Sequence, residues 1–527
     1  MADLPTPQQT PPPASKSKRF LTNVLWNWVG VGTNLAVGLV LSRYVIHKLG
    51  DERYGIWALI FSILDYFWFF DLGLNTAVTN FCARFEASHE PEKINEVLNT
   101  GLFYFSVLSL VIGALVLTLS RHVDAFFQVS PAYRSEFSTL ILLTGLSWAV
   151  CIVLHIFVSA LDGFQRFDLS SRVWVLTLVL RSTGYFVVLK MGYGLLAMAG
   201  LYVFFQFTGY VLNFLNLRSV FRPLRFSFVY VRWQMFKEIV SYGIRSFLAN
   251  ASDLTLSQSA PVLIGHFKRA EFVGYYQLPA KLLQYAVDAV ARIGMVTRSS
   301  AAELTAMGRH DAVLDLAVYS NRYSFTLFMP LVLMLLVYGE EVILHWVGPA
   351  FAANSAPLLP VLLLATALVT AGQFNSSSLL FGLNRHGGYA RAVTVEAILN
   401  VIGMIIVIPR FGILGAAWVA SALMLAVRGI YTPYLVCQNL NVSFFRFLRL
   451  IYIRPLLTAA PVLLLAYLMK TLWIPGQSWP GLILAGAVIS VSYSVLAFYT
   501  CIEPEHRKVI LGRIPVVGGR LSAAVAP

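Results

Sequence analysis

Charged side chains inside long apolar segments are the residues of this sequence best suited to chemistry. Five of them are cations, namely Arg43, Arg181, Arg245, Lys281 and Arg292. A charge is costly in hydrocarbon, so each is expected to face protein or a water-filled cavity. The spacing of Lys281, Asp288 and Arg292 places all three on one face of a helix. Simpler alternatives remain open, because Arg43 can extend its charge to the membrane interface and Asp288 can pair with Arg292.

Two carboxylates stand inside apolar segments as well. Asp253 lies within Asn250-Ala251-Ser252-Asp253-Leu254-Thr255, and Glu396 is followed one helical turn later by Asn400. Carboxylate, amide and hydroxyl oxygens suit a sodium ion, and a lone aspartate can equally take up and release a proton. These residues are therefore candidates for an ion site. The alternative is that Asp253 only pairs with Arg245 or with another cation in the same cavity.

The overall composition says where these charges must lie. Of the 527 residues, 58% are hydrophobic and only 12% are charged, and the mean hydropathy is +0.71. A soluble protein cannot hide so many apolar side chains, so the chain is expected to be an all-α polytopic membrane protein. The net charge of +14 comes from basic residues in short loops, which indicates membrane topology rather than nucleic-acid binding. The four cysteines have no metal-like spacing and are expected to be buried free thiols.

About fourteen spans are expected, since a membrane-crossing helix needs about 20 mostly apolar residues. They lie near 20–46, 55–82, 98–120, 137–163, 170–190, 194–217, 238–265, 273–298, 316–338, 357–383, 391–408, 412–437, 446–470 and 480–501. Alternate loops carry more Arg and Lys, which predicts that both termini are cytoplasmic. Residues 1–19 are proline-rich and read as a disordered tail, and 502–527 form a basic tail.

An internal repeat organises these spans. A shift of 219 residues brings His47 onto His266, Gly55 onto Gly274, and Gly163 onto Gly382, among other matches. Six spans separate the copies, so the sequence predicts two parallel-repeat six-helix lobes. The predicted parts are the lobes 20–217 and 238–437, a basic linker 218–237 between them, and an extra helix pair at 438–501. Paired lobes of this kind suit alternating access to a site near the bilayer midplane.

Motifs for catalysis are missing from the sequence. It contains no P-loop, no GxSxG, no HExxH and no Cys/His cluster, and no predicted loop is long enough to hold a catalytic domain. The chain is therefore expected not to be an enzyme and to need no cofactor beyond a coupling ion. A transporter is the function that these observations favour.

The run LGDERYGIWALIFSILDYFWFFDLGLNTAVTNFCAR resembles the start of the polysaccharide transport proteins. These are O-antigen and exopolysaccharide lipid-linked oligosaccharide flippases of the multidrug/oligosaccharidyl-lipid/polysaccharide exporter (MOP) superfamily. The resemblance rests on Leu49-Gly50, Tyr54-Gly55, Asp71-Leu72-Gly73-Leu74 and Arg84. Within this run, Asp71 is expected to cap or brace a bend before Gly73.

The resemblance implies a flippase that moves an undecaprenyl-diphosphate-linked oligosaccharide across the bacterial inner membrane. It implies a cationic cavity for the diphosphate, and the five cations named above are the candidates for it. Relatives use a Na⁺ or H⁺ site in one lobe, for which Asp253, Glu396 and Asn400 are the candidates. The implied partners are the lipid-linked substrate, membrane lipids and polysaccharide polymerase or assembly proteins, with no nucleic acid.

One feature departs from a related branch of the superfamily. The peptidoglycan-precursor flippases are expected to carry arginines within the first span, where this sequence has Asn23, Asn27 and Asn34. That difference favours the polysaccharide branch. Two alternatives stay open: a multidrug-type exporter of small molecules coupled to a cation, and a membrane polysaccharide polymerase or ligase. The first predicts twelve spans and a less cationic cleft, and the second predicts a sizeable outer loop.

Overall fold

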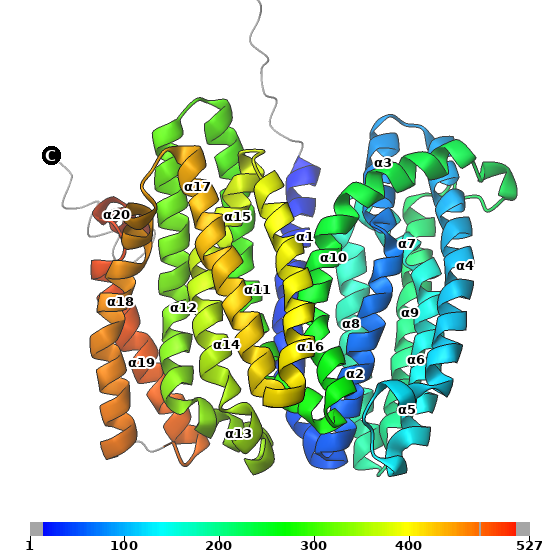
Figure 1. Ribbon diagram of the computed structural model, residues 1–527. Helices are drawn as coiled ribbons and strands as arrows, with labels where there is room; N and C mark the ends of the chain where they lie inside the picture. Colours follow the sequence, from blue (N-terminus) through cyan, green and yellow to red (C-terminus); the bar gives the residue numbers. More distant parts are fainter. Residues whose placement is uncertain (1–13, 474–475, 513–527) are drawn as a thin grey trace, which may run out of the picture. The chain divides into compact units, whose positions relative to one another are not determined.

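A computed structural model describes residues 14–473 and 476–512, and the described chain is almost entirely helical (Figure 1). It divides into two compact units, residues 1–251 and 252–527. The first unit contains α1 (Ala14–Leu49), α2 (Asp51–Tyr66), α3 (Leu74–Ala87), α4 (Pro91–Arg121), α5 (Val123–Phe126), α6 (Arg134–Leu154), α7 (Ile156–Gly163), α8 (Phe167–Lys190) and α9 (Leu195–Val220). Helix α10 (Trp233–Phe267) begins in the first unit and ends in the second.

The second unit continues with ten further α-helices. They are α11 (Ala270–Ala306), α12 (His310–Val347), α13 (Pro349–Ser355), α14 (Leu358–Thr366), α15 (Gly372–Gly382), α16 (Gly387–Met424), α17 (Thr432–Leu440), α18 (Phe444–Leu468), α19 (Trp479–Thr500) and α20 (Pro504–Gly512). Three π-helical segments interrupt this run, namely η4 (Ala367–Ala371), η5 (Leu425–Tyr431) and η6 (Met469–Trp473). Its core lies where α11, α12, α15, α17 and α18 meet, with Ala301, Val313 and Phe447 nearly inaccessible.

The membrane character predicted from composition is confirmed. Within the described residues, ten helices are long and apolar enough to span a membrane, or eleven if the bent pair α2–α3 counts as one. Large apolar side chains on their outer faces, such as Leu110 and Ile483, are mostly exposed, as lipid contact requires.

The number fourteen stays a prediction. One of the ten candidates, Gly387–Leu440, contains a non-helical break at Gly412. The chain folds back there (Figure 1), and a Cβ at Gly403 would lie 2.8 Å from a methyl carbon of Val419 on the returning arm. Helices α10 and α11, with 35 and 37 residues, are long enough to cross but are not among the candidates. Each carries several charged residues.

The bend between α2 and α3 is built as the sequence suggests. The helices meet at 51°, and Leu72 and Gly73 take left-handed φ angles of 49° and 74°. Asp71 Oδ1 accepts hydrogen bonds from the backbone N–H of Asn75 at 3.2 Å and from its side-chain amide at 2.6 Å. Asp71 therefore caps the start of α3, which is the bracing role predicted for it. A Cβ at Gly73 would collide with the carbonyl oxygen of Gly243, so this position requires glycine.

The 219-residue repeat is present in the packing of each unit. In the first unit, a Cβ at Gly163 would lie 2.7 Å from the carbonyl oxygen of Thr79. In the second, a Cβ at Gly382 would lie 2.6 Å from the carbonyl oxygen of Arg298. Gly382 follows Gly163 by 219 residues, and Arg298 follows Thr79 by the same number. The contact of α7 with α3 is therefore reproduced by α15 with α11.

Backbone conformation repeats at the same interval. Gln165 and Asn384 both have φ of 54°, and His89 and Gly308 have φ of 57° and 69°. Each pair is 219 residues apart and follows the end of an equivalent helix. Left-handed φ is uncommon outside glycine, so its recurrence at matched positions is evidence of a shared turn rather than of shared composition. The sequence repeat is thus also a structural repeat.

The linker between α9 and α10 is held on α4 by polar side chains. Asn95 donates to the carbonyl oxygen of Pro223 at 3.0 Å and accepts from the backbone N–H of Arg225 at 2.8 Å. Asn99 donates to the carbonyl oxygen of Arg225 at 2.8 Å, and Thr100 accepts from the N–H of Arg232 at 3.1 Å. Three buried side chains on one helix thereby fix an irregular segment of backbone.

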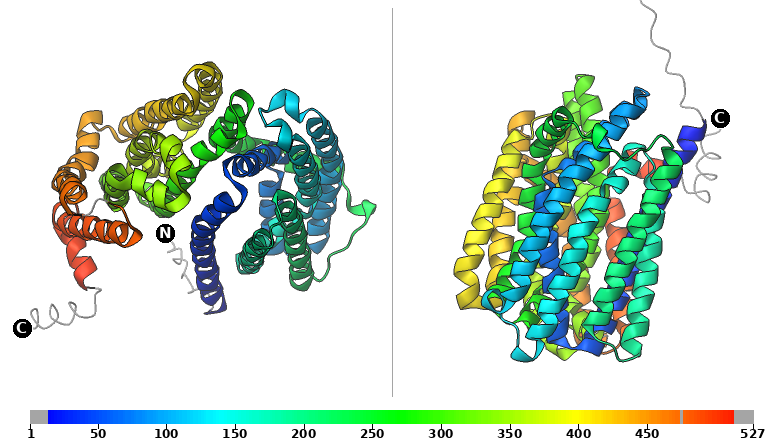
Figure 2. Two further views of the ribbon diagram at one scale, coloured as in Figure 1. Left: turned by 90° about the horizontal axis from the view of Figure 1, so that it is seen from below. Right: turned by 90° about the vertical axis from the view of Figure 1, so that its right-hand side faces the viewer.

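The extra pair α18 and α19 packs on α12 (Figure 2, left, orange to red). All four cysteines are free and buried, as predicted. Helix α1 begins at Ala14, inside the stretch 1–19 that the sequence predicts as a disordered tail. Alanine, lysine and arginine favour helix, and the segment simply extends the first span upstream. The rest of that tail and residues 513–527 of the basic tail lie outside the described residues.

Candidate functional site

The second unit contains an arginine that joins two of the predicted carboxylates. Arg428 Nε lies 3.1 Å from Glu396 Oε2, and Arg428 Nη2 lies 3.4 Å from Asp253 Oδ1. Asp253 comes from α10, Glu396 from α16 and Arg428 from η5. Three separate elements therefore converge on one guanidinium. We call these three residues the Arg428 cluster.

The local backbone geometry directs the Arg428 side chain toward Glu396 and Asp253. The residue lies in the π-helical segment η5, where the N–H of Thr432 bonds the carbonyl oxygen of Val427. The Thr432 hydroxyl donates to the same oxygen at 3.0 Å. A π-helical turn is wider than an α-helical one, so it redirects the side chains that it carries, and such turns are frequent at functional sites.

Burial falls steeply across the Arg428 cluster. The side chain of Glu396 is 3% exposed, that of Arg428 is 28% exposed, and that of Asp253 is 67% exposed. The guanidinium cannot lose its charge, so the buried Glu396 carboxylate has a permanent partner. Asp253 is held at longer range in a more open environment. One end of the guanidinium therefore meets a buried carboxylate, and the other end meets an exposed one.

Further polar groups surround the Arg428 cluster. The hydroxyls of Ser252 and Thr394 lie 3.0 Å apart and connect α10 to α16 beside it. Asn400 is buried, and its side-chain oxygen finds no hydrogen-bond partner within the part of the chain that the structure describes. Asn400 thus lies one turn along α16 from Glu396, as the sequence indicates, but it is not part of the ion pair.

The described side chains among the five predicted cations lie on different helices. Arg43 is exposed near the end of α1, and Lys281 is exposed on α11. Arg181 on α8 is half-buried, with its guanidinium 5.3 Å from the ring centroid of Tyr202. The side chains of Arg245 and Arg292 lie outside the described residues, so their predicted pairings stay predictions. Asp288 accepts a hydrogen bond from Gln284 at 2.8 Å.

The sequence reasoning missed Arg428. The residue lies within the expected span 412–437, so the rule that selected the other intramembrane charges also applies to it. Its pairing could not be read from the sequence, because Asp253 and Arg428 are 175 residues apart. The structure shows Asp253 paired with a cation, Arg428, while a role of Asp253 in an ion site stays a prediction.

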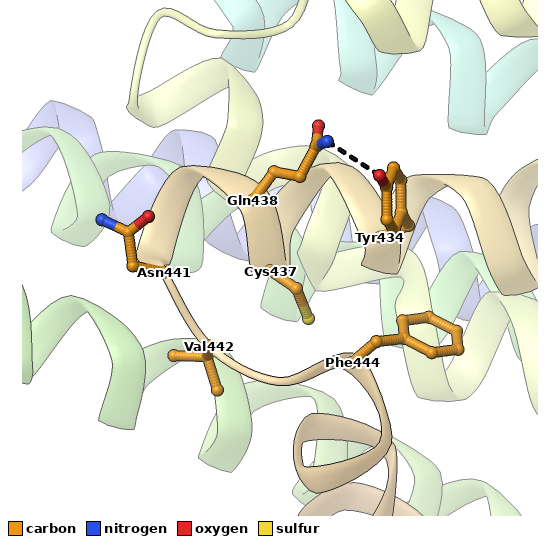
Figure 3. A pocket seen from close by; sticks show the side chains of 6 residues that line it. All are labelled: Tyr434, Cys437, Gln438, Asn441, Val442 and Phe444. Carbon is orange, nitrogen blue, oxygen red and sulfur yellow. Dashed lines mark hydrogen bonds between the residues drawn. The ribbon is translucent and has the colours of Figure 1, made fainter.

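A shallow hollow elsewhere in the second unit is a weaker candidate. Tyr434, Cys437 and Gln438 of α17 line it, together with Asn441, Val442 and Phe444 (Figure 3). The Gln438 amide donates to the Tyr434 hydroxyl at 2.9 Å, and no charged residue is present among the six. Among the described residues, no group of three His, Cys, Asp or Glu side chains is placed to hold a metal ion. The Arg428 cluster is therefore the strongest candidate site in the described chain.

Comparison with known proteins gives this geometry a context. Residues 20–297 match the family model described as "Polysaccharide biosynthesis protein". A Shigella flexneri protein named "Putative O-antigen transporter" is 18% identical over 424 residues, which cover 78% of this chain and 98% of that protein.

Solved transporter structures share the fold. The structure titled "Lipid II flippase MurJ, inward closed conformation" superposes with a TM-score of 0.69 at 15% identity, covering 91% of this chain and 99% of that one. An inward-facing multidrug resistance MATE family transporter of the MOP superfamily superposes with a TM-score of 0.59 at 14% identity, covering 78% and 94%. At these identities the likeness is one of fold.

Proposed function

The chain belongs to the polysaccharide biosynthesis protein family, and from this membership we propose that it moves a lipid-linked oligosaccharide across the bacterial inner membrane. The proposed cargo is an oligosaccharide repeat unit on undecaprenyl diphosphate, carried from the cytoplasmic to the outer leaflet. The proposal rests on the family match together with the likeness of fold. The family match covers residues 20–297, and the lipid II flippase fold extends over 91% of the chain.

The physical task accounts for the kind of protein that is needed. A diphosphate and a string of sugars must pass hydrocarbon while the polyprenyl tail stays in lipid. Transfer of a bare phosphate charge into hydrocarbon is prohibitive, so the path must supply cations and water. Arginine suits the diphosphate because its planar fork donates two hydrogen bonds at once. Arg428, whose Nη2 meets the exposed Asp253, joins Arg43, Arg181, Arg245, Lys281 and Arg292 as a proposed cation of this path.

The proposed mechanism is alternating access, in which the two repeated lobes rock against each other around a central site. Coupling to a cation gradient belongs to the same proposal. The carboxylates of Asp253 and Glu396 are the groups proposed to respond to the coupling ion, with Asn400 beside them. Partners in polysaccharide assembly, such as a polymerase, are proposed on the ground of family membership alone.

The test is a flipping assay in inverted membrane vesicles. Vesicles with and without the protein receive a labelled undecaprenyl-diphosphate oligosaccharide in the outward-facing cytoplasmic leaflet. We expect the label to become protected from an added glycosidase only when the protein is present. Equal protection in both vesicle populations would exclude the proposed function. A small cationic dye, assayed in the same vesicles, distinguishes a multidrug-type exporter, which would move the dye and leave the lipid accessible.

A further inference from the structure

The resemblance to cation-coupled flippases and exporters raises the question of whether Asp253 and Glu396 hold a sodium ion. The geometry of the second unit indicates that they do not. We propose that Arg428 is an internal cation that occupies the place between Asp253 and Glu396 where a sodium ion would otherwise bind. On this proposal the carboxylate pair of the wild-type protein binds no Na⁺, and removal of Arg428 creates a sodium site.

Distances and charge support this assignment. Both carboxylates direct an oxygen at the same guanidinium, at 3.1 Å from Glu396 and 3.4 Å from Asp253. A sodium ion bound by those oxygens would lie within a few ångströms of a fixed positive charge, and the repulsion would be strong at an intramembrane position. The guanidinium stays charged at every accessible pH, so it cannot vacate the site by losing a proton.

The arrangement is more than a simple ion pair. Glu396 alone would neutralise Arg428, yet Asp253 from a different helix converges on the same group. A cation that bridges α10 and α16 is what a bound metal ion would provide. Here the Arg428 side chain supplies that cation. The π-helical segment η5 directs this side chain toward the two carboxylates.

The surroundings are consistent with an internal cation. The Ser252 and Thr394 hydroxyls, which would suit sodium, bond to each other at 3.0 Å. The charge sum of Asp253, Glu396 and Arg428 is minus one, and the surplus lies on Asp253, whose side chain is the most exposed. A proton or a positively charged ligand can still reach that end.

The experiment measures sodium binding directly, on the purified full-length protein in detergent. Unfolding temperature and ²²Na⁺ binding are measured in NaCl, KCl and choline chloride at equal ionic strength. We expect the wild-type protein to show no difference between Na⁺ and K⁺. We expect Arg428→Ala to gain saturable ²²Na⁺ binding that the wild type lacks, and to unfold at a higher temperature in Na⁺ than in K⁺. The double variant Arg428→Ala/Asp253→Asn should lose that gain.

Two outcomes would overturn the proposal. One is saturable Na⁺ binding by the wild type that disappears in Asp253→Asn, since the metal would then bind despite the arginine. The other is no gain of Na⁺ binding in a folded Arg428→Ala protein. If Arg428→Ala does not fold, Arg428→Gln takes its place, and Arg428→Lys serves as the variant that keeps the cation. No lipid substrate enters these measurements, so their outcome is separate from that of the flipping assay.

Discussion

Arg428 and Glu396 form an ion pair in which the carboxylate is almost completely buried, with Nε 3.1 Å from Oε2 and Glu396 only 3% exposed. The same guanidinium reaches Asp253, which is 67% exposed, at 3.4 Å. Two contacts of one arginine thus lie in very different surroundings. Because buried and exposed ion pairs differ in strength, the two carboxylates should differ sharply in their contribution to stability.

We expect Glu396→Gln to lower the free energy of unfolding by about 3 kcal/mol, because it leaves the arginine charge without its buried partner. Asp253→Asn should cost about 1 kcal/mol or less, because an exposed pair is weak. Thermal unfolding followed by tryptophan fluorescence in detergent compares the two variants directly. An equal effect of both changes would contradict the burial gradient across the Arg428 cluster.

Transport should depend on Arg428 itself. We expect Arg428→Ala to reduce the rate of lipid-linked oligosaccharide flipping about tenfold or more, since a hydrogen bond to a charged group contributes about 1.5–3 kcal/mol. Arg428→Lys should retain part of the rate, because it keeps the charge but loses the fork. Arg391→Ala is the matched control: this arginine lies on α16, the helix of Glu396, is exposed, and bonds only the carbonyl oxygen of Gly387 among the interactions described. A wild-type rate in Arg428→Ala would remove the residue from the transport path.

Much of the fold follows from the sequence because membrane insertion leaves few choices. Apolar length gives the spans, and a repeat of turn residues gives the internal duplication. The match of Gly163 to Gly382 in the sequence corresponds to a real equivalence of close helix contacts. The start of α1 at Ala14 does not follow from the sequence in the same way, because the charged flank Lys16–Arg19 can either end the apolar span or extend its helix.

The sequence predicts the two carboxylates of the candidate site but not the arginine that pairs with them. Asp253 and Glu396 stand out as carboxylates in apolar surroundings, and the structure brings them to one arginine. Which cation pairs with them depends on how α10, α16 and η5 pack, and no local pattern encodes that. Arg181, by contrast, contacts Tyr202 on the adjacent α9. The same local signal, an arginine in an apolar span, thus has two different structural outcomes.

The glycine contacts of the repeat give a test that is independent of transport. We expect Gly163→Ala and Gly382→Ala each to destabilise the protein by about 1–3 kcal/mol, because a Cβ at either position would press on a backbone carbonyl oxygen. The control is Gly200→Ala on α9, where a Cβ meets nothing within 4 Å. That change should be neutral or stabilising by up to about 1 kcal/mol, because alanine favours helix. Similar unfolding temperatures for all three variants would contradict the close packing.

The segment before α20 should make the stability of the second unit depend on acid. Glu503 accepts from Arg322 on α12 and from Arg454 on α18, each at 2.8 Å, and Arg322 is only 2% exposed. Burial by itself would raise the pKa of Glu503. The hydrogen bond from Arg322 and the charges of Arg322 and Arg454 outweigh that effect and hold the pKa below its ordinary value of 4.5.

A lowered pKa means that the folded state favours the ionised carboxylate. The stabilisation is therefore complete above the ordinary value of 4.5 and is lost as the pH falls through the lower folded-state pKa. We expect Glu503→Gln to unfold at a lower temperature than its parent at pH 7, and the difference to shrink progressively below pH 4.5. A difference that persists unchanged at pH 3 would show that Glu503 acts through packing rather than through its charge.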